Sequence, residues 1–209
     1  MRLVLASNNR KKLAELQALL APVGVELVAQ RTLGIVEADE PHRTFIENAL
    51  ATARHAAHHA GGAAIADDSG LCVDALDGAP GVGSAHFARI ELPPIEREAQ
   101  RALQDSANNA LLLQRMQRVA DRHAHYVCTL VALRSADDPE PLVALGRWSG
   151  TLLHAPVGAG GFGYDPLMFI PALQRTVAEL DGEVKNAHSH RALAAGEMVR
   201  LMREAWHIG

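Results

Sequence analysis

The N-terminal segment constrains the fold more than any other part of the chain, because it combines a short apolar run, a polar turn and an amphipathic stretch. Residues 2–6 (RLVLA) predict a buried strand. Asn9–Ala21 predicts a helix, since its leucines recur on one face at Leu13, Leu16 and Leu20. The turn is rich in residues that cap helix N-termini, namely Ser7, Asn8 and Asn9. A chain that opens in this order is typical of an α/β protein.

The later segments continue the alternation of strands and helices. We expect a strand at 25–29, a helix starting at Thr44 with Glu47 as its capping-box partner, and a strand at 63–67. Helical structure over 95–121, with a break near Ser106–Asn109, should follow. The rest of the pattern predicts β-like runs at 124–134 and 142–153, joined by a turn through Asp137–Pro141, and a final helix over about 190–206. Loops are expected at 78–84 (GAPGVGS) and in the Gly-rich stretch 158–166. The pattern predicts an α/β fold with a long twisted mixed sheet flanked by helices, in which residues 1–209 form one domain of two lobes.

Composition excludes several classes of protein. Hydrophobic residues make up 48% of the chain and aromatic residues only 4%, so a core built largely of Ala, Leu and Val is expected. The formal net charge of −4 and the scattered basic residues disfavour a nucleic-acid-binding protein, which normally presents a basic face. No apolar stretch approaches the roughly 20 residues needed to cross a bilayer, and the N-terminal apolar run is too short for a signal peptide. We therefore expect a cytoplasmic protein that does not interact with membranes.

The polar turn at the start of the chain is a candidate anion site. A strand that leads through a turn into a helix leaves unpaired backbone N–H groups at the turn, and the helix dipole adds positive potential there. Three basic residues, Arg10, Lys11 and Lys12, follow directly, and Lys12 lies about one helical turn in. An ordinary capped surface helix explains the same residues, and no GxxxxGK[ST] phosphate-binding loop occurs in the chain.

Carboxylates cluster at the end of the strand expected at 63–67, in the sequence ADDSGL (66–71). Strand alternation sends Asp67 and Asp68 to opposite faces, so only one of them can readily point into a given cleft. That carboxylate suits Mg²⁺, which prefers oxygen ligands and usually keeps substrate phosphates and water as well. A plain Asp-Asp-Ser-Gly turn is the alternative interpretation.

Two further motifs contain residue types suited to a nucleotide base. In GAGGFGYDP (158–166), glycines allow close approach of the backbone, and Phe162 and Tyr164 offer flat aromatic faces. In KNAHSHRAL (185–193), hydrogen-bond donors gather at a probable helix start. By contrast, we do not expect the other histidines (His55, His58, His59, His123 and His125) to be metal ligands, since no metal-site motif such as HExxH is present.

The order of these motifs resembles that of a known family. The blocks are SxNxxKxxE at 7–15, TFIENA at 44–49, ADDSGLxVDALxGAPGVxSA at 66–85, GGFGYDP at 160–166 and KNAxSHRxxA at 185–194. Together they closely resemble the inosine triphosphate pyrophosphatase family over nearly the whole chain. The resemblance implies an elongated α/β fold, a homodimer, a nucleotide groove between two lobes, and Mg²⁺-dependent hydrolysis of ITP, dITP and XTP to the monophosphate and pyrophosphate.

The resemblance also assigns roles to individual residues. Asp68 is implied as the general base and a metal ligand, and either Asp39 or Glu40 as the second acidic ligand. The implied substrate contacts are Ser7, Asn8, Asn9, Arg10, Lys11, Lys12, Ser69, Phe162, Gly163, Tyr164, Asp165, Lys185, His190 and Arg191. The sequence departs from the family pattern at Gly83 and His86, where the family usually has Tyr and Arg at the rim of the substrate groove.

Selectivity is expected to follow from hydrogen-bond polarity. Inosine and xanthosine carry an acceptor oxygen at purine C6, where adenine carries an amino donor. Donors from His190 or Arg191 would pair with the oxygen and oppose the amino group. Three alternatives remain. His190 and Arg191 disfavour a pyrophosphatase for other nucleotides, and Lys12 with the Asp67-Asp68 pair disfavours a nucleotide sensor without turnover. The acidic net charge disfavours a nucleic-acid-binding module.

Overall fold

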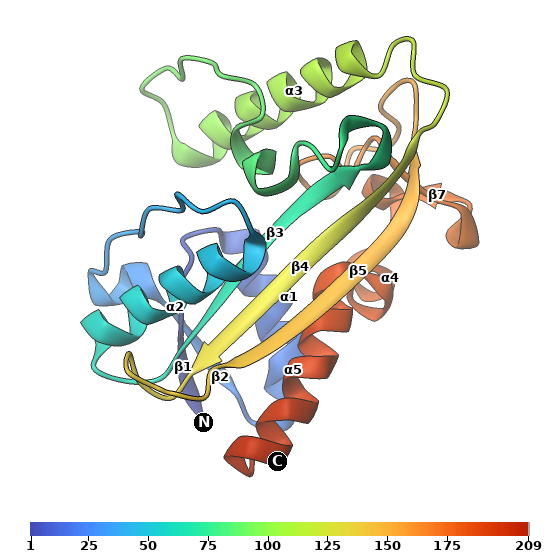
Figure 1. Ribbon diagram of the computed structural model, residues 1–209. Coiled ribbons are helices and arrows are strands. Elements are labelled where there is room, and N and C mark those ends of the chain that lie inside the picture. The colour runs from blue at the N-terminus through green and yellow to red at the C-terminus, as the bar shows by residue number, and fades with distance from the viewer. Residues whose placement is uncertain (209) are drawn as a thin grey trace. The chain divides into compact units, whose positions relative to one another are not determined.

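The computed structural model describes residues 1–208 and divides the chain into two compact units (Figure 1). The first unit comprises Met1–Ser69, Val127–Arg147 and Asn186–Gly209, of which the last residue is not described. The second comprises Gly70–Tyr126 and Trp148–Lys185. None of the helices in residues 1–208 combines the length and apolar character needed to cross a membrane.

Seven strands form one mixed sheet. They are β1 (Arg2–Leu5), β2 (Glu26–Ala29), β3 (Ala64–Val73), β4 (His123–Leu133), β5 (Leu142–Leu152), β6 (Met168–Ile170) and β7 (Arg175–Thr176). Their hydrogen-bonded order is β2-β1-β3-β4-β5-β6-β7. β1 pairs in parallel with β2 and with β3, whereas β6 pairs antiparallel with β5 and with β7. The α/β class and the mixed sheet flanked by helices are confirmed.

Within residues 1–208, five α-helices accompany the sheet. They are α1 (Arg10–Leu20), α2 (Phe45–Ala60), α3 (Arg97–Arg115), α4 (Gly182–His188) and α5 (His190–Trp206). The expected N-caps are confirmed: Asn9 accepts hydrogen bonds from the backbone N–H groups of Lys11 and Lys12, and Thr44 accepts one from that of Glu47. Glu47 pairs in return with the Thr44 hydroxyl, at 2.6 Å.

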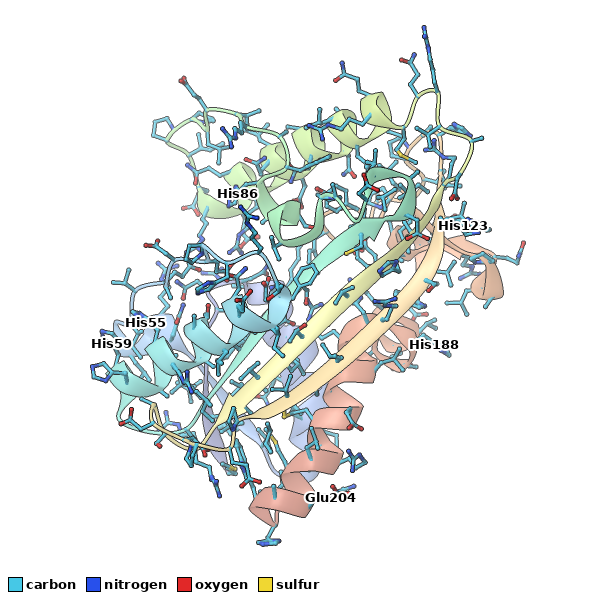
Figure 2. The ribbon with its side chains drawn as sticks, in the orientation of Figure 1. His55, His59, His86, His123, His188 and Glu204 are labelled. Atoms are coloured by element: carbon cyan, nitrogen blue, oxygen red, sulfur yellow. The ribbon has the colours of Figure 1, made fainter. Side chains whose placement is uncertain are left out.

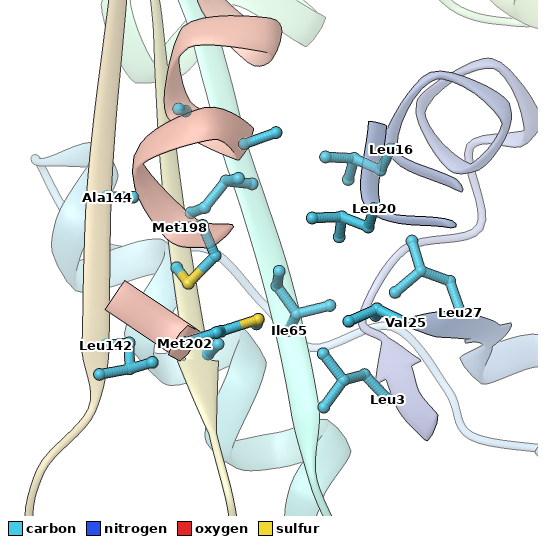
Figure 3. Close-up of a cluster of buried hydrophobic side chains, with 14 of the residues drawn as sticks. Leu3, Leu16, Leu20, Val25, Leu27, Ile65, Leu142, Ala144, Met198 and Met202 are labelled. Carbon is cyan, nitrogen blue, oxygen red and sulfur yellow. The ribbon is translucent and has the colours of Figure 1, made fainter. Parts of the chain in front are cut away.

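The first unit has a hydrophobic core on each face of its part of the sheet. Alternation along β1 sends Leu3 and Leu5 to the core shared with α1 and α5, and Val4 to the core shared with α2. Figure 3 shows the first of these cores, where Met198 and Met202 of α5 lie with the leucines of α1 and with Ile65. The α2 face is built mainly of alanines, as expected from the low aromatic content.

A glycine sets the close approach of α5 to β5 within the first unit. A Cβ atom at Gly146 would overlap the backbone carbonyl of His190 and would lie 2.6 Å from the backbone nitrogen of Ala194. Only a residue without a side chain fits there, because backbone atoms cannot move aside as a flexible side chain can. The packing of Gly146 therefore fixes the first turns of α5, where two predicted site residues are located.

The second unit has its own core, formed where α3 and the loops after β5 cover the strands. Its fully buried members include Leu71, Leu112 and Met116, and Tyr164 packs with them. The predicted base-binding loop is thus anchored by one aromatic side chain inside this core.

Two expectations about secondary structure are wrong, for the same reason. β3 does not end at residue 67 but continues through Asp67-Asp68-Ser69-Gly70 to Val73, and α3 has no break at Ser106–Asn109. In both segments, polar side chains that suggested a turn bind tertiary partners. Asn108, for example, is buried in α3 and donates to the backbone carbonyl groups of Ser84 and Ala85. Such bonds compensate for the low intrinsic helix or strand propensity of these residues.

The turn between β4 and β5 depends on one buried carboxylate. Asp138 accepts hydrogen bonds from the backbone N–H groups of Arg134 and Glu140, at 2.9 and 3.0 Å, and from the Arg134 guanidinium. The Arg134 side chain is the main cause that lowers the pKa of Asp138 to about 2. The turn is therefore stabilised by an ionised Asp138.

We expect Asp138→Ala to lower the free energy of unfolding by about 1–2 kcal/mol, because two backbone donors lose their acceptor. Urea unfolding measures this difference. Arg134→Ala is the control and should cost less, since its side chain is half exposed. Because the pKa of Asp138 is lowered from 3.8, its contribution is complete above that pH and is lost as the pH falls toward 2. A difference between Asp138→Ala and wild type that stays constant over this interval would contradict the assignment.

Candidate active site

Asp67 on β3 is the centre of a buried ion-pair cluster in the first unit. Its carboxylate accepts a hydrogen bond from the Arg191 Nε atom at 2.6 Å and forms an ion pair with the Lys12 Nζ atom at 2.9 Å. The Ser69 hydroxyl donates to the same carboxylate at 2.6 Å. Burial alone would raise the pKa of Asp67, but the positive charges of Arg191 and Lys12 outweigh it and hold this pKa well below its usual range. Asp67 is therefore an ionised, fully paired structural carboxylate.

Arg191 at the start of α5 is held by two carboxylates. Besides Asp67, its guanidinium pairs with Glu15 of α1, and only 1% of its side chain is exposed. The cluster thus joins β3, α1 and the first turn of α5. Glu15 ends the SxNxxKxxE block, but the sequence assigns it no role and predicts Arg191 as a substrate contact. That substrate contact stays a prediction, and the Arg191 guanidinium already has two carboxylate partners.

Asp68 is as little exposed as Asp67 but differs from it in its partners. It is 6% exposed, and its Oδ2 atom is buried without a hydrogen-bond partner among residues 1–208. Burial raises the pKa of Asp68 to about 7, and the negative charge of Glu40 adds to the shift. Strand alternation thus gives one aspartate that is neutralised by cations and another that faces a second acidic residue. The two carboxylates therefore have different electrostatic environments.

Asn48 of α2 links Asp68 to the acidic loop that precedes the helix. The carboxamide binds both backbone polar groups of His42. It accepts a hydrogen bond from the N–H at 2.9 Å and donates one to the carbonyl at 3.3 Å. It also forms a side-chain hydrogen bond with Asp68 that opposes the rise in its pKa. Asn48 is 1% exposed, and its side chain binds the loop that carries Glu40. These bonds explain the Asn in the TFIENA motif.

The predicted anion turn forms one side of a cleft of about 440 Å³. Asn9 caps α1, and the Ser7 hydroxyl accepts a hydrogen bond from the Asn9 backbone N–H at 3.2 Å. The cleft is lined by Ser7, Asn8, Asn9, Arg10, Leu13, Ala29, Arg31 and Thr32. Arg31, which the sequence motifs did not indicate, adds a second guanidinium to this lining.

The predicted base-binding loop of the second unit is organised by Asp165. Its carboxylate accepts hydrogen bonds from the Phe162 backbone N–H, the Tyr126 hydroxyl and the Lys185 Nζ atom, each at 3.0 Å. The Lys185 ammonium also lies 4.5 Å from the centre of the Phe162 ring. Three predicted contact residues are therefore brought together, with Tyr126 as a partner that sequence reasoning missed.

The middle of this loop is held by Tyr164 and Gly163. The Tyr164 side chain is buried, and its hydroxyl donates to the Ser84 carbonyl at 2.9 Å. The backbone N–H of Gly163 donates to Asp105 at 2.8 Å, and its carbonyl accepts from Asn109 at 2.9 Å. Gly83 and His86, the two departures from the family pattern, are exposed in the 3₁₀ helix Gly81–His86 (Figure 2).

The donor set around Asp68 fits a hard divalent cation. Carboxylate oxygen is the ligand that Mg²⁺ prefers, and the buried Oδ2 atom is available in the absence of another partner within residues 1–208. After burial, the charge of Glu40 is the largest cause that raises the pKa of Asp68. The part of the chain that the structure describes contains no group of three or more His, Cys, Asp or Glu side chains placed to hold a metal. Two carboxylates suffice for Mg²⁺ when phosphates and water complete its coordination.

The histidines of α2 form a separate cluster. The rings of His55 and His59 lie 4.3 Å apart between centroids. Figure 2 shows both side chains near the end of the helix. Their ring nitrogens bond to backbone carbonyl groups, His55 to Val36 and His59 to His55. These contacts give both side chains a structural role near the end of α2.

A protein-family model described as the Ham1 family matches residues 3–201. The chain belongs to the Ham1 family. Among curated relatives, the dITP/XTP pyrophosphatase of Methylibium petroleiphilum is 68% identical over 206 residues, which cover 99% of each chain. The dITP/XTP pyrophosphatase of Burkholderia pseudomallei is 56% identical over 97% of this chain and 94% of that protein.

Solved structures of Ham1 family proteins have the same fold. A HAM1 protein from Coxiella burnetii superposes with a TM-score of 0.85 at 37% identity, covering 98% of this chain and 100% of the other. A nucleoside-triphosphatase or dITP/XTP pyrophosphatase from Mycobacterium abscessus has a TM-score of 0.69 at 40% identity, covering 93% and 97%. The family assignment that the motifs indicated is therefore confirmed.

Proposed function

We propose that this Ham1 family member hydrolyses abnormal purine nucleoside triphosphates (ITP, dITP and XTP) to the monophosphate and pyrophosphate, with Mg²⁺ as its cofactor. One observation carries the chemistry: Asp68 is a buried carboxylate with an unpaired oxygen, next to the acidic Glu40 and the cationic Lys12. The substrate class rests on the names of the curated relatives, which match this chain over nearly its full length.

Asp68 and Glu40 are the residues that would hold the cation, with Glu40 preferred to Asp39. A bound Mg²⁺ supplies positive charge to the phosphates and lowers the pKa of coordinated water. Asp68 accepts the proton of the water that attacks the α-phosphorus, and pyrophosphate leaves from the opposite side. The turn from Ser7 to Lys12 offers side-chain cations to the phosphates, and the N-terminus of α1 adds the positive end of the helix dipole.

Lys12 has two neighbours that define its role. Its ammonium donates to the Asp67 carbonyl at 3.1 Å and pairs with the Asp67 carboxylate, while its charge also acts on Asp68. Because Asp67 holds it, the ammonium is already oriented before substrate arrives, which reduces the entropy lost on binding. We propose that Lys12 binds the phosphates from this position, with Ser69 as a further contact.

The base is assigned to residues of the second unit, Phe162 to Asp165 together with Lys185. For recognition of the purine 6-oxygen we retain His190 as the donor, because the Arg191 guanidinium is bound to two carboxylates. The resemblance also implies a homodimer, which we propose as the functional state. The cytoplasm, which contains the nucleotide pool, is the proposed compartment.

The proposed activity predicts a defined set of products. With Mg²⁺, the pure protein is expected to release pyrophosphate and monophosphate in equal amounts from ITP, dITP and XTP. ATP should react roughly 5- to 150-fold less efficiently, since its 6-amino group leaves a buried donor unpaired. GTP and dTTP complete the panel, and EDTA should abolish turnover. Pyrophosphate and orthophosphate are measured separately; release of orthophosphate alone would place bond cleavage away from the α-phosphorus and refute the proposal.

A further inference from the structure

Helix α3 binds both backbone polar groups of Gly163, the N–H and the carbonyl. The Gly163 backbone N–H donates to the Asp105 carboxylate at 2.8 Å, and the Gly163 carbonyl accepts from the Asn109 carboxamide at 2.9 Å. Residues 105 and 109 are four apart and therefore lie on the same face of the helix. All three residues belong to the second unit. Neither helix residue is part of any motif that the sequence resemblance includes.

Gly163 has no side chain that could anchor it in the predicted base-binding loop. Its φ is +61°, a left-handed conformation that glycine adopts without strain, and nothing would contact a Cβ atom there within 4 Å. Its two neighbours differ, since Tyr164 is buried and bonded to Ser84, and Phe162 is bonded to Asp165. Without Asp105 and Asn109, the loop would be fixed at both sides of Gly163 but not at Gly163 itself.

The helix residues are themselves well placed to act as a rigid support. Asn108, which precedes Asn109 in the same helix, is 1% exposed and accepts a hydrogen bond from the backbone N–H of Ala88 at 2.9 Å. Gln104 donates to the Ala88 carbonyl at 2.7 Å and is 6% exposed. These buried bonds fix the rotation of α3 about its axis, so Asp105 and Asn109 are presented to the loop in a set direction.

We propose that Asp105 and Asn109 are positioning residues that hold the base-binding loop in its binding conformation. The inference rests on the proposed function for the identity of the ligand. The bond from Gly163 to Asp105 is charge-assisted and therefore among the stronger hydrogen bonds in proteins. Ordering the loop in advance removes an entropy cost that substrate binding would otherwise bear. The residues act on base binding and leave the phosphate chemistry unchanged.

The kinetic test compares variants of α3. Asp105→Ala and Asn109→Ala are each expected to raise KM for ITP about tenfold while kcat stays within about twofold, because each removes one loop contact. Asp105→Asn keeps an acceptor oxygen and should recover most of the loss. Ser106→Ala, on the exposed side of the same helix, is the matched control and should behave as wild type. A fall in kcat at constant KM, or no change in either, would overturn the proposal.

Two binding measurements separate positioning from general damage. Calorimetric titration should show weaker binding of IMP to Asp105→Ala, by about tenfold, and unchanged binding of pyrophosphate with Mg²⁺. Equal losses for both ligands would overturn the proposal. Hydrogen exchange of the segment 160–164 should speed up in Asp105→Ala and not in Ser106→Ala. Failure of the wild-type protein to release pyrophosphate would refute the proposed function alone. Because hydrogen exchange needs no substrate, it would still decide whether Asp105 holds the loop.

Discussion

Asp68→Asn is expected to lower turnover of ITP by about 10²- to 10⁴-fold, the range that a positioned general base contributes. Asparagine has the same shape, but it can neither accept a proton from water nor offer an anionic oxygen to a cation. Initial-rate measurement of pyrophosphate release checks the loss. Turnover close to that of wild type would remove Asp68 from the chemistry.

The same variant should keep the fold. Asp68 has one oxygen without a partner in residues 1–208, and the negative charge of Glu40 adds to the rise in its pKa to about 7. A carboxyl whose pKa is raised on folding destabilises the folded state as the pH rises above its ordinary value of 3.8. In EDTA at pH 8, Asp68→Asn should therefore melt at the same temperature as wild type or higher. A large fall in melting temperature would mean that the loss of turnover reflects unfolding.

Arg191→Met is expected to lower the free energy of unfolding by about 3–5 kcal/mol, because it leaves the buried carboxylate of Asp67 without its closest cation. Glu15 loses a partner as well. Lys12 still pairs with Asp67 in this variant, which limits the loss of stability. Chemical denaturation at neutral pH measures the difference. Wild-type stability combined with a raised KM would show instead that the guanidinium serves only the substrate.

A double-mutant cycle isolates the pair. Asp67→Asn combined with Arg191→Met should cost less than the sum of the single changes, since each single change already breaks the same Asp67–Arg191 ion pair. Arg191→Lys is the conservative control and should lie between wild type and Arg191→Met, because an ammonium cannot reproduce the two-sided contacts of a guanidinium. Additive losses would contradict a direct Asp67–Arg191 interaction.

Local sequence patterns were sufficient where one segment determines its own structure. Helical spacing of leucines and the caps at Asn9 and Thr44 predicted α1 and the start of α2. The bounds expected for the last helix agree with α5, His190–Trp206. Periodicity and capping are properties of a few neighbouring residues, so they can be read without knowing the rest of the fold.

Polar clusters inside elements could not be interpreted in this way. The chain around Asp67-Asp68 suggested the end of a strand, and Ser106–Asn109 suggested a break in a helix. Both segments are regular because their side chains find partners far away in sequence, such as Arg191 for Asp67 and Ser84 for Asn108. Propensity describes the isolated segment, whereas tertiary hydrogen bonds and ion pairs change the balance.

The candidate site shows the same division. The sequence by itself determined the family, the α/β class and the residue types that chemistry on a polyphosphate needs. Only the tertiary structure showed that Asp67 is paired with two cations, placed Asn48 and Glu40 beside Asp68, and assigned Asp105 to the loop at Gly163. The physical reason is that charge state and orientation depend on burial and on partners that are distant along the chain. Residue type sets what a group can do, and its neighbours in space decide what it does.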